Sequence, residues 1–101
     1  MFDRDRDRYI TRGIKGIRNP TTYLLLWQLI DDMPKDLQKD YLQVFTLSTK
    51  FGMEGIQVVE HSQEVPEYSS VHKFRTSMAV NMKIFVIDEG DHSTMLLADE
   101  Y

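Results

Sequence analysis

The sequence contains three histidines, and two of them stand near carboxylates with which they could do acid–base or metal chemistry at neutral pH. His61 precedes Glu64 by three residues, and His92 directly follows Asp91. A zinc site needs three or four such ligands, and a separation of three residues brings two side chains together on a helix, not at the end of a strand. No metal site is predicted. A small hydrolase or metal enzyme using His61 and His92 is kept as an alternative, which requires that the two side chains meet in space.

The segment Asp91-His92-Ser93 contains the three residue types of a hydrolytic triad. It lies in a stretch that reads as a strand, and neighbouring residues on a strand point to opposite faces. These three residues therefore cannot form a triad by themselves. A nucleophile at Ser62 or Ser93 would need a histidine from a neighbouring strand. The five glycines form no phosphate-binding pattern, so no cofactor is predicted.

Basic side chains at the N-terminus and around residue 73 are the candidates for contact with a partner. Residues 1–18 carry a net charge of +3 and residues 19–101 a net charge of −7, which gives the overall −4. An acidic body disfavours non-specific binding to nucleic acid, because phosphates must be neutralised by surplus cations. The basic N-terminal residues keep a nucleic-acid-binding accessory protein as a second alternative. The candidate contact residues are Arg4, Arg6, Arg8, Arg12, His72, Lys73 and Arg75.

The strands that must position these side chains follow from the apolar pattern. Residues 82–88 are apolar on both faces, which predicts a strand in the middle of a sheet, and a turn at Gly90 leads to a returning strand. The segment around His72 alternates and carries basic residues, as protected edge strands do. The predicted strands cover residues 8–14, 41–47, 55–62, 71–75, 82–88 and 92–98.

One long helix is predicted from about Pro20 to Met33. Asn19 can cap it, and proline suits the first helical position because its missing N–H costs nothing there. The apolar side chains that share one face at helical spacing are Tyr23, Leu26, Trp27, Ile30 and Met33. The fold class is therefore α+β, with a mainly antiparallel sheet of about five or six strands and one long helix packed on one face.

Length and composition predict a single domain over residues 1–101, with residues 1–7 as a charged N-terminal arm. With 42% apolar and 28% charged residues, the chain is not expected to be disordered. The arm has no apolar segment that would make it a signal peptide, and the longest apolar run, residues 23–27, is too short to span a bilayer. The chain lacks cysteine, which favours the cytoplasm.

Several blocks spread over nearly the whole chain resemble a family of short proteins of unknown function from staphylococci and related Gram-positive bacteria, found also on plasmids and phages. The blocks are Met1-Phe2-Asp3, Arg6, Arg8-Tyr9, Gly13, Leu26-Trp27-Gln28-Leu29-Ile30-Asp31, Asp40-Tyr41-Leu42-Gln43-Val44-Phe45, His61-Ser62-Gln63-Glu64, Lys83-Ile84-Phe85-Val86-Ile87-Asp88, Gly90, His92-Ser93-Thr94-Met95-Leu96-Leu97-Ala98 and Glu100-Tyr101. The resemblance implies a free-standing intracellular bacterial protein, and it implies no activity, cofactor or catalytic residue.

Because no converging catalytic groups are recognisable, the sequence favours a non-enzymatic protein-interaction or regulatory module over an enzyme. Its expected partner is a protein or a second copy of the chain, and no membrane contact is expected. Strand addition at the edge strand around His72 is the predicted binding mode.

Overall fold

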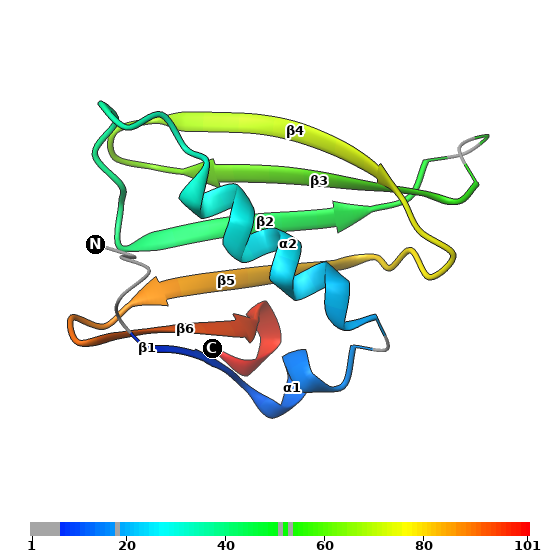
Figure 1. Cartoon of the computed structure of the whole chain (residues 1–101), viewed down its shortest axis with the longest axis horizontal. Helices are drawn as coiled ribbons and strands as arrows, with labels where there is room; N and C mark the ends of the chain where they lie inside the picture. Colours follow the sequence, from blue (N-terminus) through cyan, green and yellow to red (C-terminus); the bar gives the residue numbers. More distant parts are fainter. Residues whose placement is uncertain (1–6, 18, 51, 53) are drawn as a thin grey trace.

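The computed structural model describes residues 7–17, 19–50, 52 and 54–101. The described residues form six strands, two α-helices and a short 3-10 helix (Figure 1). In chain order these are β1 (Asp7–Ile10), α1 (Arg12–Lys15), α2 (Pro20–Asp31), β2 (Leu42–Ser48), β3 (Ile56–Gln63), β4 (Tyr68–Arg75), β5 (Met82–Asp88), β6 (His92–Leu97) and η1 (Ala98–Glu100).

The six strands form one sheet in the order β1-β6-β5-β2-β3-β4. All neighbouring strands are antiparallel except β1 and β6, which are parallel. The predicted α+β class with a mainly antiparallel sheet is therefore confirmed, and the apolar strand β5 lies in the middle of the sheet as expected. Figure 1 shows β4 and β1 at the two opposite edges.

Two predicted boundaries are wrong at the N-terminal end of the chain. The first strand ends at Ile10, because Thr11 starts a helical turn by accepting a hydrogen bond from the Ile14 amide (3.5 Å). The strand also begins at Asp7, inside the range predicted for the charged arm. The strand around His72 is longer than predicted, and its position at the sheet edge is confirmed.

The predicted helix begins where expected but is not long. The Asn19 side chain accepts a hydrogen bond from the Thr21 amide (3.1 Å), which confirms the cap. The helix has 12 residues and ends at Asp31, because Pro34 disfavours helical geometry in the residue before it. Met33 is nevertheless buried, in the turn that follows the helix.

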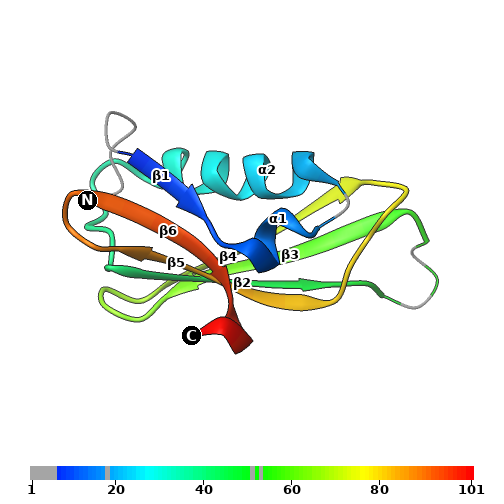
Figure 2. The same ribbon diagram turned by 90° about the horizontal axis from the view of Figure 1, so that it is seen from below.

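The hydrophobic core lies between α2 and one face of the sheet, which Figure 2 shows edge-on. Leu26 and Ile30 of α2 are fully buried in one cluster with Phe45, Ile84 and Met95 from three strands. Burial of such side chains contributes roughly 1.5–3 kcal/mol each. The opposite face carries η1 at the C-terminal end (Figure 2). Among the described helices, none is long and apolar enough to cross a membrane.

The carboxylate of Glu100 fastens the C-terminal end of the chain to α1. It accepts hydrogen bonds from the Thr11 hydroxyl (2.6 Å), the Leu97 amide (2.8 Å) and the Gly13 amide (3.2 Å). The Thr11 hydroxyl is the main reason why the pKa of Glu100 lies below its usual value, and the two amides add to the effect. A β-carbon at Gly13 would lie 2.5 Å from the carboxylate oxygen and 2.8 Å from Leu97 Cδ1, so the Glu100 and Leu97 side chains would have to move from these positions.

Replacing Gly13 by alanine is therefore expected to lower the free energy of unfolding by about 1–3 kcal/mol, the usual cost of overpacking. Chemical denaturation measures the loss. Gly16→Ala is the matched control in the same turn, since its β-carbon would have no atom nearer than 3.4 Å, and it should be neutral or slightly stabilising. In a Glu100→Ala background the cost of Gly13→Ala should shrink. Equal stabilities of the two glycine variants would contradict the close approach.

Candidate interaction site

His61 lies in a buried polar network under α2 and not in an accessible site. Its Nε2 donates to Gln43 Oε1 (2.7 Å), because a carboxamide oxygen can only accept. Its ring stacks on Phe45, with centroids 4.3 Å apart, and meets Tyr68 edge-on. The side chain is only 1% exposed, and burial lowers the pKa of His61 to about 4, with a smaller contribution from the nearby His72. His61 is thus neutral and structural at pH 7.

Gln43 and Gln63 extend this network to the neighbouring connections. The Gln43 amide donates to the carbonyl of Asp40 (2.9 Å) and to Gln63 Oε1 (2.7 Å). The Gln63 amide in turn donates to the carbonyls of Gln38 (3.0 Å) and Pro66 (2.8 Å). Because buried amides are costly when unpaired, these bonds fix the two connections onto the ends of β2 and β3.

His92 is held in a different place by two carboxylates. Its Nδ1 lies 2.6 Å from Asp91 and its Nε2 lies 2.6 Å from Glu89. The hydrogen bond to Asp91 is the main reason why the pKa of His92 is raised, and Glu89 raises it further. Its neighbour Ser93 is fully buried and lies opposite Arg8 in the sheet, and Arg8 lies over the Trp27 ring of α2. Ser93 therefore faces α2. Because neighbouring residues of a strand point to opposite faces, the His92 ring faces the side of the sheet away from α2.

The structure does not bring His61 and His92 together. They lie on opposite faces of the sheet, and β5 and β2 separate their strands, a distance of about 14 Å at the usual strand spacing. Ser93 and His92 point to opposite faces, so the expectation that Asp91-His92-Ser93 cannot form a triad is confirmed. Within the described ranges, no group of three or more histidine and carboxylate side chains is placed to hold a metal ion.

Of the candidate contact residues in the N-terminal region, Arg8 is held within the fold and Arg12 is exposed. Arg8 binds Asp31 of α2 through two nitrogens (2.6 and 3.2 Å) and lies 4.9 Å from the centroid of the Trp27 ring, so it ties β1 to the helix. Arg12 is exposed on α1. Arg4 and Arg6 lie outside the described residues.

The candidate contact residues His72, Lys73 and Arg75 lie together on β4. His72 faces the same side as His61, with its Nε2 2.9 Å from Ser70 Oγ. Lys73 and Arg75 are exposed on the other side. Val71, on the same side as Lys73, is 59% exposed, which is unusual for a β-branched residue in the middle of a strand. In the described sheet β4 pairs with β3 alone, so one long side of its backbone is open.

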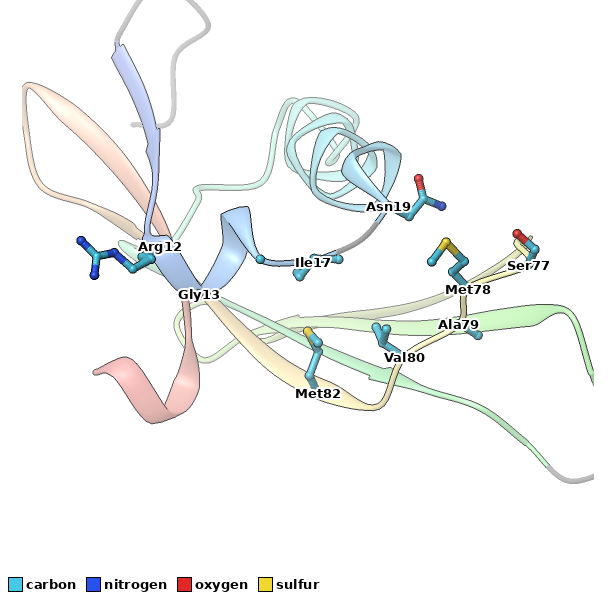
Figure 3. A pocket seen from close by; sticks show the side chains of 10 residues that line it. Arg12, Gly13, Ile17, Asn19, Ser77, Met78, Ala79, Val80 and Met82 are labelled. Carbon is cyan, nitrogen blue, oxygen red and sulfur yellow. The ribbon is translucent and has the colours of Figure 1, made fainter.

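A cleft of about 550 Å³ was not expected from the sequence. It lies between the residues that follow α1 and the connection from β4 to β5 (Figure 3). Apolar side chains make up most of its wall, namely Ile17, Met78, Ala79, Val80 and Met82. The polar side chains that line the cleft are Arg12, Asn19 and Ser77, and Figure 3 shows the Arg12 side chain pointing away from the apolar wall.

Comparison with known proteins gives a family and a fold without an activity. Residues 7–100 match the family described as "Staphylococcal protein of unknown function (DUF960)". The chain is also similar to a crystal structure of a protein of unknown function from Enterococcus faecalis, with 29% sequence identity and a TM-score of 0.84 over 99% of this chain and 94% of that chain. Among curated proteins, none matches the chain.

Proposed function

The chain belongs to the staphylococcal DUF960 family, whose function is unknown. On that premise we propose that it is a non-enzymatic interaction module, which accepts an extended protein segment as an added strand at β4. The observation that carries this proposal is the length of the open edge. β4 has eight residues, all of them paired with β3 on the inner side. Main-chain hydrogen bonds along such an edge supply affinity, and alternate side chains supply specificity.

The opposite edge is a poorer site for the same reason. Within the described part of the chain β1 comprises four residues, and Arg8 near its centre is held against α2 by Asp31. An added strand would therefore find fewer main-chain partners at β1 than at β4. At β4 the segment would lie beside the exposed side chains of Val71, Lys73 and Arg75, which favour apolar, hydroxyl or acidic residues opposite them.

Nucleic-acid binding through the N-terminal basic residues is the weaker alternative. Of those within the described ranges, Arg8 is already engaged with Asp31 and Trp27, and the chain as a whole carries a charge of −4. Both features lower the attraction for phosphate.

We also place the protein in the cytoplasm of a Gram-positive bacterium or of a host of its plasmids and phages, because a small secreted domain would more often contain cysteine.

The proposal is tested by capture from a lysate of the host with tagged protein in which the β4 edge is altered. Lys73→Glu combined with Arg75→Glu should abolish recovery of a protein that the wild type captures, including an untagged copy of this chain. Lys83→Glu is the matched control, since Lys83 is exposed on the same face but in a central strand, and it should leave recovery unchanged.

Nuclease treatment separates the two functions. Recovery that survives nuclease and depends on the β4 side chains supports an interaction module. Recovery that disappears with nuclease would favour nucleic-acid binding, and recovery that is indifferent to the β4 substitutions would contradict the proposed edge.

A further inference from the structure

We infer that the strand accepted by β4 is β4 of a second copy of this chain, paired antiparallel about a two-fold axis through Val71. This inference rests on the proposed function, because it names the partner of the same edge. A two-fold axis perpendicular to the sheet would leave α2 of both copies on the same side. It would also join the two six-stranded sheets into one continuous sheet.

The side chains of β4, together with Glu67 in the turn that directly precedes the strand, support this register because every pair that it creates is complementary. In an antiparallel pair about Val71, residues at equal distances on either side of the axis lie opposite each other. The resulting pairs are Val71 with Val71, Ser70 with His72, Ser69 with Lys73, Tyr68 with Phe74, and Glu67 with Arg75. They comprise an apolar contact, a hydroxyl–imidazole pair, a hydroxyl–ammonium pair, an aromatic pair and an ion pair.

The side chains at the centre of this register, Val71, and at its two ends, Glu67 and Arg75, are exposed in a single copy and are therefore accessible to a partner. Val71 is 59% exposed in a single copy, and self-pairing would bring the two valines side by side. Glu67 and Arg75 are both exposed, and within the described part of one copy neither side chain takes part in a hydrogen bond or ion pair. Because the axis repeats each pair, the dimer would contain two Glu67–Arg75 ion pairs.

Neighbouring registers are less favourable. An axis through His72 places two imidazoles opposite each other and leaves Arg75 opposite Ser69. An axis through Ser70 places Pro66 opposite Phe74, and proline lacks the N–H that a strand pair requires. An axis between two neighbouring residues would place each of them opposite the other in the second copy. Neighbouring residues point to opposite faces of the sheet, whereas residues directly opposite each other in an antiparallel pair must point to the same face.

Sedimentation equilibrium of the purified full-length protein from about 1 μM to about 1 mM tests the inference over the affinity range of weak interfaces. The wild type should form a dimer. Arg75→Glu places two glutamates opposite each other, and Glu67→Arg places two arginines opposite each other. Each single substitution should weaken the dimer by about tenfold or more, whereas the double variant Glu67→Arg/Arg75→Glu should recover an affinity close to that of the wild type.

Lys83→Glu is again the control for a change of charge at a site away from the edge, and it should leave the dimer unchanged. Both altered residues are exposed, so far-UV circular dichroism should confirm that all variants fold. A wild type that remains monomeric at every concentration would overturn self-pairing, while edge-dependent capture of another protein would still support the proposed function. A dimer that ignores both single substitutions, or that the double variant fails to restore, would overturn the register.

Discussion

The Phe45→Ala variant is expected to lose about 3–5 kcal/mol of its free energy of unfolding, the range found when a buried aromatic ring is removed. Phe45 is fully buried in β2, one of the two central strands, and belongs to the cluster that α2 covers. Its ring also stacks on His61. The substitution therefore leaves a cavity at the centre of the core and removes the apolar support of the buried imidazole. Denaturation with guanidinium chloride at pH 7 measures the loss.

Two further variants keep this result interpretable. Phe45→Leu preserves most of the volume and should cost less than about 1.5 kcal/mol, so it remains measurable if the alanine variant does not fold. Phe85→Ala removes the same ring from the opposite face, where Phe85 is half-buried beside Tyr101, and its cost should be smaller. A loss at position 45 no greater than that at position 85 would be inconsistent with the core described above.

The second large effect is that His61 lowers the free energy of unfolding in mild acid. The pKa of His61 is about 4 in the folded protein, against 6.5 for the free side chain, so below pH 6.5 the unfolded chain takes up a proton that the folded chain excludes. The stabilising contribution is complete above pH 6.5 and is lost as the pH falls towards 4. At ~1.4 kcal/mol per pH unit, this loss amounts to about 3 kcal/mol.

Two other groups with shifted pKa values, His92 and Glu100, act outside most of this window. The raised pKa of His92 gives a contribution that is already complete below pH 6.5 and is lost only as the pH rises through its folded value. The lowered pKa of Glu100 gives a contribution that is lost below about pH 4.5, the pKa of the free side chain. Of these three groups, His61 is the one whose contribution changes most between pH 6.5 and 4.5.

The matched variant is His61→Gln, whose amide can still donate to Gln43 but does not titrate. Its free energy of unfolding, measured with urea at half-unit intervals of pH, should be nearly constant between pH 6.5 and 4.5, while the wild type declines. Parallel curves for the two proteins would show that His61 is not shielded from protons in the way that its burial predicts.

The local parts of the fold were predictable from the sequence because short-range rules govern them. Asn19 and Pro20 mark the start of α2, and the alternation around His72 marks an edge strand. Trp27 is buried as its helical phase predicts, and only the structure shows that Arg8 covers its ring. The separation of His92 from Ser93 also follows from strand geometry alone.

The parts that could not be predicted depend on residues far apart in the sequence. The approach of Glu100 to Gly13 joins two ends of the chain, and no local pattern encodes it. The buried network did leave a signal, because Gln43 has the same strand phase as the buried Phe45, so a polar residue at a core position could have been recognised. Its partners Gln38 and Pro66 lie in irregular segments whose paths sequence patterns do not determine.

The parallel pairing of β1 with β6 has a consequence for how the protein is made. Arg8 lies opposite Ser93 in the sheet, so during synthesis β1 leaves the ribosome long before its partner exists. The hairpins of β2 to β4 can form in the meantime, since their contacts are local, whereas β1 must wait for the last strand. The nascent chain thus has an unprotected N-terminal segment until β6 emerges, and a stalled or truncated product would expose that segment to proteases.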